Sequence, residues 1–137
     1  MNRHCKVSGI SGVWIIALTG ALLAACGSQD DAARGSAEKV IAAKLKDPSS
    51  ARFSDVFLAE AKAPVPETRH VAVCGTVDGK NSFGAYSGGS RFVVLKSFGL
   101  GQFKTEGTLF AEIENLSSAS SANAFAQVYW SKYCEKK

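Results

Sequence analysis

This chain of 137 residues has few side chains of the types that bind metals or act in redox reactions: two histidines, four cysteines and one methionine. No two cysteines have the C-x-x-C spacing of a redox motif, and a zinc site would need more ligands. The stretch "SGGS" lacks the G-x-x-x-x-G-K-[ST] spacing of a phosphate-binding loop, and no G-x-S-x-G motif lies near His70. We therefore expect no metal, no cofactor and no enzyme activity.

A long apolar run is also missing. The stretch "VWIIALTGALLAA", residues 13–25, is shorter than the roughly 20 apolar residues that span a membrane. Arg3, His4 and Lys6 precede it, which is the layout of an export signal. The run ends in "LAAC", which resembles the lipobox of bacterial lipoproteins. An ordinary cleavable signal followed by a coincidental cysteine is the alternative.

The lipobox resemblance implies that the signal peptide, residues 1–25, is removed and that Cys26 carries lipid such as palmitate. Gly27 and Ser28 lack the aspartate that retains lipoproteins in the inner membrane. The expected location is therefore the outer membrane, with a lipid-anchored protein that faces the periplasm. Removing 25 of the 137 residues leaves 112, which suits one small domain. We expect that domain over residues 36–137, behind a flexible lipidated tether of residues 26–35.

The charge of the processed chain gives little support for a polyanionic partner. Losing Arg3 and Lys6 with the signal lowers the formal net charge from +4 to +2. No dense basic stripe appears, so nucleic acid is not an expected partner. A weakly basic surface favours an acidic protein partner instead.

The cysteines predict one disulfide. Cys5 leaves with the signal and Cys26 is used for lipid, so Cys74 and Cys134 remain. Two such thiols most often pair in the oxidising periplasm. Closing a loop of about 60 residues stabilises a fold by roughly 4 kcal/mol.

Hydrophobic periodicity predicts four strands between two helices. The strands are expected over residues 51–61, 70–79, 90–98 and 107–115. The first helix is expected to start after Ser36 as its N-cap and to end before Pro48, and the second to lie within residues 121–137. The expected fold class is α+β, with a small antiparallel sheet of three to four strands, helices on one face and one disulfide.

The apolar residues define the expected faces of these elements. In the second strand, Val71, Val73 and Val77 share one face, whereas Ala72 and Cys74 share the other. The last helix has a broad apolar stripe, formed by Ala122, Ala126, Tyr129, Trp130 and Tyr133. Cys134 lies on the edge of this stripe, from which it would reach inward to Cys74.

Two segments carry a wider resemblance: "LKDPSSARF", residues 45–53, and "VAVCGTVDGKNSFGAYSGGSRFVV", residues 71–94. They resemble a family of small secreted, lipoprotein and prophage-encoded domains with the pattern L-K-D-P-x-S-A-x-F, then V-C-G-x-V-N-x-K-N-S-F-G-G-Y-x-G. This chain departs from the pattern at Asp78-Gly79 and at Ala85. The resemblance implies a shared fold and the pairing of Cys74 with Cys134. That family has no established activity, so function stays open.

The glycine-rich loop after the second strand is the candidate binding site. Lys80, Asn81, Tyr86 and Arg91 would form a polar and aromatic patch at one end of the sheet. The alternative is a purely structural loop, in which Asn81 closes an Asx-type turn and Phe83 and Tyr86 fold back on the strands.

No catalytic group stands out. His70 is expected to be an unremarkable surface residue, and Glu112 and Glu114 are expected to be solvated charges on one exposed strand face. The leading hypothesis is therefore a non-catalytic outer-membrane lipoprotein that binds a protein or cell-wall partner in the periplasm.

Two other functions remain open. One is a periplasmic inhibitor or immunity protein, because "YSGGSRF", residues 86–92, is similar to the S-G-x-x-Y loop of lipoprotein lysozyme inhibitors. The other is a lipoprotein component of an envelope secretion or pilus assembly.

Overall fold

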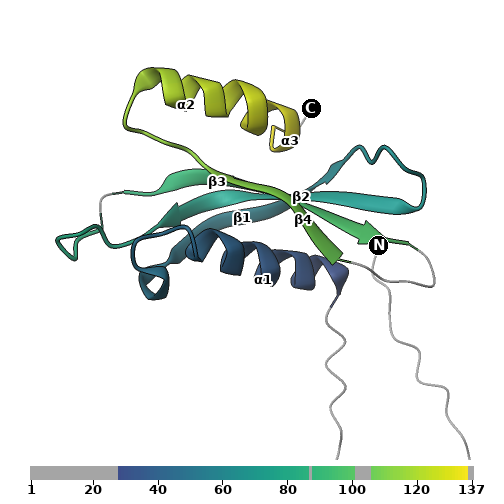
Figure 1. The fold of residues 1–137 in the computed structure, drawn as a ribbon, viewed down its shortest axis with the longest axis horizontal. Coiled ribbons are helices and arrows are strands. Elements are labelled where there is room, and N and C mark those ends of the chain that lie inside the picture. Colours follow the sequence, from purple (N-terminus) through teal and green to yellow (C-terminus); the bar gives the residue numbers. More distant parts are fainter. Residues whose placement is uncertain (1–27, 87, 101–105, 136–137) are drawn as a thin grey trace, which may run out of the picture.

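Four antiparallel strands form one sheet in the order β1-β2-β3-β4 (Figure 1). Their bounds are Arg52–Ala61 for β1, Thr68–Asp78 for β2, Ser90–Gly99 for β3 and Glu106–Ile113 for β4. The computed structural model describes residues 28–86, 88–100 and 106–135, so the predicted signal peptide, the lipobox and Cys26 lie outside the described residues. The α+β class and all four predicted strands are confirmed.

Both faces of the sheet are apolar along its two central strands. Val71 and Val73 of β2 are fully buried on one face, whereas Ala72 and Cys74 are fully buried on the other. A sheet with two apolar faces needs a covering layer on each of them. The predicted division of the β2 residues between the two faces is therefore confirmed.

One helix covers each face (Figure 1). Helix α1 (Gln29–Ala42) lies on the face of Val71 and Val73, and the C-terminal helical segment lies on the face of Cys74. The expectation that both helices share one face is wrong, since it would leave half of the apolar surface of β2 in water. Within the three described ranges, no helix has the length and hydropathy needed to cross a membrane.

Helix α1 begins much earlier than predicted. Ser28 is its N-cap, with a side chain that accepts a hydrogen bond from the backbone N–H of Asp31, and the Asp31 carboxylate accepts one from the backbone N–H of Ser28. This reciprocal capping box satisfies two N–H groups that would otherwise lack partners. Ala33 is fully buried, one turn before Ala37, so residues 29–35 are part of the packed domain. The prediction that they form a flexible tether is wrong.

Ser36, the predicted N-cap, instead lies inside α1 and binds a buried lysine. The Lys96 ammonium is almost inaccessible to solvent and donates to Ser36 Oγ at 2.8 Å and to Thr108 Oγ1 at 2.9 Å. It also lies 2.8 Å from Glu106 Oε1, and its hydrogen bond is the main cause of a lowered pKa at Glu106. Three oxygen partners match the three protons of an ammonium group, which compensates its burial in the core.

The chain leaves α1 through a tight turn. Asp47 has extended backbone geometry, as predicted from Pro48, and its side chain caps a short 3₁₀ helix, η1 (Pro48–Ser50), by accepting from the backbone N–H of Ser49. α1 itself ends at Ala42, so Lys44 and Lys46 lie in the turn and not in the helix.

The C-terminal helix is irregular. It consists of α2 (Ala119–Phe125), a π-helical segment η2 (Ala126–Trp130) and a last turn α3 (Ser131–Tyr133). Phe125 is its buried apolar residue, and Trp130, five positions later, packs in the same cluster. The predicted stripe omitted Phe125, although Phe125 lies three residues after Ala122 and four before Tyr129 of that stripe.

Cys74 and Cys134 form the predicted disulfide. Their Cα atoms are 5.9 Å apart, within the usual range for such a bond. Cys74 lies in the middle of β2 and Cys134 directly after α3, so the bond fastens the end of the chain to the centre of the sheet.

Candidate functional site

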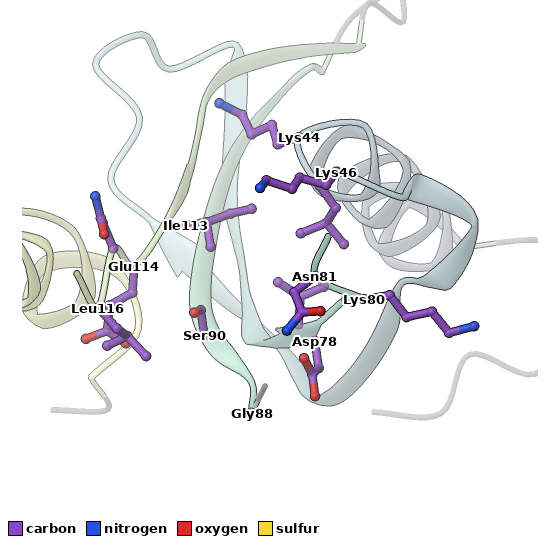
Figure 2. A pocket seen from close by; sticks show the side chains of 14 residues that line it. Lys44, Lys46, Asp78, Lys80, Asn81, Gly88, Ser90, Ile113, Glu114 and Leu116 are labelled. Atoms are coloured by element: carbon purple, nitrogen blue, oxygen red, sulfur yellow. The ribbon is translucent and has the colours of Figure 1, made fainter. Parts of the chain in front are cut away.

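The loop between β2 and β3, the turn after α1 and the segment after β4 lie at the same end of the sheet (Figure 1). They border an open groove of about 450 Å³, seen from close by in Figure 2. Lys44, Lys46, Lys80, Asn81, Glu114 and Leu116 are among its lining residues. The groove therefore includes two of the four predicted binding residues, Lys80 and Asn81.

Asn81 closes the loop on itself. Its side-chain Oδ1 accepts hydrogen bonds from the backbone N–H of Phe83 at 2.9 Å and of Ala85 at 3.1 Å. Gly84, between them, has a φ of 78°, which only glycine adopts readily. The structure thus has the Asx-type turn expected from the structural alternative, and the side-chain oxygen of Asn81 is used within the loop.

Tyr86 anchors the loop to the segment before β1. Its hydroxyl donates to the backbone oxygen of Ser50 at 3.0 Å, and the guanidinium of Arg52 lies 3.9 Å from the centre of its ring. Lys80 pairs with Tyr86 across the loop, and its backbone N–H donates to Ser50 Oγ at 2.9 Å. Tyr86 folds back as expected, and these contacts make the loop a fixed projection from the sheet.

Phe83 points into solvent at the tip of this loop. Its side chain is 94% exposed, so the expectation that it folds back on the strands is wrong. The turn closed by Asn81 holds residues 82–84 away from the sheet. Leu116, which lines the groove, is 60% exposed. Exposed large apolar side chains beside a polar groove are typical of surfaces that bind proteins.

More basic than acidic side chains line the groove, with three lysines against Asp78 and Glu114. Figure 2 shows that the side chains of Lys44 and Lys46 extend in the same direction, whereas Lys80 points the opposite way. Lys46 Nζ donates to Ser82 Oγ at 2.8 Å, which joins the turn after α1 to the loop. The charge of Lys80 contributes, after the hydrogen bonds from Ser49, to a lowered pKa at Asp47, so Lys80 is already near an acidic group. Lys44 and Lys46 therefore extend together at the border of the groove, and Lys80 lines it apart from them.

Gly79 lies close to the turn that carries these lysines. A Cβ atom at this position would lie only 2.9 Å from Leu45 Cδ1, so the turn between Lys44 and Lys46 packs directly against the end of β2. A larger residue would require the end of the Leu45 side chain to shift. The role of Lys44 and Lys46 was not predicted because it depends on this contact between segments that are far apart in the sequence.

Arg91 has a structural role and does not join the loop residues. It donates from Nε to Glu114 Oε2 at 2.9 Å and from Nη2 to Glu114 Oε1 at 2.6 Å. Its guanidinium also lies 4.9 Å from the ring centre of Trp130, so it links the start of β3 to the C-terminal helix. These hydrogen bonds raise the pKa of Arg91 and lower that of Glu114.

The acidic residues near the end of β4 differ from their prediction. Glu114 is buried, with a side chain only 7% exposed, and Glu112 is half-buried. The backbone N–H of Glu114 donates to the backbone oxygen of Arg91, which keeps its side chain on the sheet face of Arg91 and Trp130. The C-terminal helix covers that face. The prediction of two solvated charges is wrong for Glu114.

His70 is also buried, contrary to the prediction of a surface residue. It lies near the start of β2, on the face of Ala72 and Cys74, and lines a second hollow of about 590 Å³ with Lys132 and Tyr133. His70 and Glu114 are at opposite ends of the sheet, so they cannot act together on one substrate. The described part of the chain contains no group of three or more His, Cys, Asp or Glu side chains arranged to hold a metal.

No protein-family model, no curated protein and no solved structure matches the chain. The resemblance carried by residues 45–53 and 71–94 therefore stays a prediction.

Proposed function

We propose that this protein is a non-catalytic outer-membrane lipoprotein that binds a protein or cell-wall partner in the periplasm through the groove at the loop end of its sheet. The observation that carries the proposal is the groove itself, with two parallel lysines at its border and Phe83 exposed beside it. The anchor in this proposal is the lipidated Cys26 expected from the lipobox.

The charges indicate the chemistry of the partner. Of the two acidic residues that line the groove, Glu114 is already paired with Arg91, which leaves Asp78 against Lys44 and Lys46. A partner that presents carboxylates is therefore favoured, whether on an acidic protein segment or on cell-wall peptides. Phe83 supplies an aromatic contact of the kind that often dominates binding energy at protein interfaces.

An inhibitor or immunity protein is the second candidate, and the projecting loop favours it. Tyr86 and Arg91, in the stretch similar to the lysozyme-inhibitor loop, are engaged inside the domain, whereas Phe83 is presented to solvent on a fixed turn. A rigid loop with an exposed aromatic tip fits the cleft of an enzyme. An assay of lysozyme with micromolar protein tests this candidate, and undiminished lysozyme activity would eliminate it.

In-cell cross-linking of the lipidated protein, followed by its purification, tests the leading proposal. We expect the amount of recovered partner to fall several-fold in the double variant Lys44→Ala/Lys46→Ala. It should fall similarly, for the same partner, in the variant Phe83→Ala. Lys39→Ala/Lys62→Ala removes the same charge from exposed positions outside the groove, and Val128→Ala shortens an exposed apolar side chain on the C-terminal helix. Both controls should retain the partner. Equal partner recovery from all four variants would show that the groove is not the binding site.

A further inference from the structure

The end of the sheet opposite the groove presents two exposed apolar side chains, one in each of two neighbouring segments. Val65, in the link between β1 and β2, is 50% exposed, and Leu100, directly after β3, is 54% exposed. The backbone N–H of Leu100 donates to the oxygen of Glu67 at 2.8 Å, so these two segments are joined. The start of α1 lies at the same end of the molecule (Figure 1). We call Val65 and Leu100 the apolar end.

Very little chain separates this end from the predicted lipid. Only Gly27 and Ser28 lie between Cys26 and the first residue of α1, and Ser28 is fixed as the N-cap. Two residues extend to at most about 7 Å, so a lipid on Cys26 would hold the start of α1 at the surface of the bilayer. A domain on so short a link would stay close to the bilayer.

We propose that the apolar end rests on the lipid surface and that Val65 and Leu100 contact the bilayer. This inference rests on the lipid anchor of the proposed function. Anchor and contact are near each other, so burial of the two side chains among lipid requires little further ordering of the chain.

One cluster of charges among the described residues at this end is paired within the domain. Arg69 donates to Asp30 at 2.9 Å and also pairs with Glu60, which ties the start of α1 to β1 and β2. Its pKa is raised, mainly by the hydrogen bonds to Glu60. Because the side chains proposed to enter the bilayer, Val65 and Leu100, are apolar, we expect the contact to form on zwitterionic vesicles and to persist at high salt.

This orientation directs the groove away from the membrane. Strand β3 has 10 residues, and at about 3.3 Å per residue it spans roughly 30 Å between the two ends of the sheet. The loop with Phe83 would thus face the periplasm at that height above the bilayer.

Four single-cysteine variants test the inference: Val65→Cys, Leu100→Cys, Phe83→Cys and Leu116→Cys. All four positions are exposed, the first two at the apolar end and the others at the groove. Because Cys74 and Cys134 form a disulfide, the new thiol takes an environment-sensitive fluorophore selectively. The lipidated proteins are reconstituted in phosphatidylcholine vesicles, and an aqueous quencher is added.

The labels at residues 65 and 100 should shift to shorter emission wavelength and be quenched several-fold less than those at 83 and 116, with little effect of salt. If the intact mass shows the lipid and all four labels are quenched equally, the proposed orientation is wrong but the lipid anchor stands. An intact mass without lipid at Cys26 would overturn the anchor of the proposed function and the orientation with it. Partner capture by the groove, measured separately, does not depend on either result.

Discussion

The buried charge of Glu114 contributes to stability through its two hydrogen bonds with Arg91. We predict that Glu114→Gln lowers the free energy of unfolding by about 1–3 kcal/mol at neutral pH. The folded-state pKa of Glu114 lies below its ordinary value of 4.5, so its contribution is complete above that value and is lost as pH falls through the folded pKa. Urea unfolding should therefore show a difference between wild type and variant that shrinks in acid.

The matched control for this prediction is Glu112→Gln. Glu112 is half-buried in β4, two residues before Glu114, and no described residue forms an ion pair with it. Its removal should have a much smaller effect and no such pH dependence. Equal effects of the two substitutions would contradict the role assigned to the Arg91–Glu114 pair.

Single residues were predictable where their surroundings are local in the sequence. Asn81 accepts hydrogen bonds from residues two and four positions away, so its turn, which contains Gly84, could be predicted from that short stretch. Glu114 depends on Arg91, 23 positions earlier, and His70 on the C-terminal helix packed over its face of the sheet. The burial of these two residues is a tertiary property, which strand alternation alone does not contain.

Among the secondary-structure elements, the strands were predicted well because both periodicity and β-branched residues favour them. The start of α1 was missed for a specific reason. The residues of a capping box are small and polar, as are those of a flexible link, so Ser28 to Asp31 fit both interpretations. The buried Ala33 distinguishes them, but an alanine is too common to signal a core position.

The disulfide holds the C-terminal helix more than it holds α1. Replacing both Cys74 and Cys134 with alanine should cost about 2–5 kcal/mol of unfolding free energy, because the bond closes a loop of 60 residues. Hydrogen exchange should rise most in α2, η2 and α3, whereas α1 packs on the other face and should change less. In the processed and lipidated protein that we propose, the double replacement would leave no free thiol that could pair between molecules. A uniform rise over both helices would contradict this division of the fold.

The sheet separates two surfaces in the proposed arrangement: an apolar end near the anchor and a basic groove at the far end. This separation predicts that the two contacts can be uncoupled by length alone. Inserting a flexible Gly-Ser segment between Gly27 and Ser28 leaves the capping box intact but lets the domain leave the bilayer. Fluorophores at residues 65 and 100 should then become accessible to an aqueous quencher.

Partner capture by the groove should survive this insertion, because neither the loop nor Lys44 and Lys46 is altered. The same segment added after Lys137 is the control, and it should leave the labels at residues 65 and 100 protected. Cross-linking and quenching measured on the same preparations compare the two ends directly. The insertion at the anchor could instead abolish recovery of the partner while the labels at residues 65 and 100 stay protected from the quencher. That result would mean that the two ends do not act independently and would contradict the arrangement.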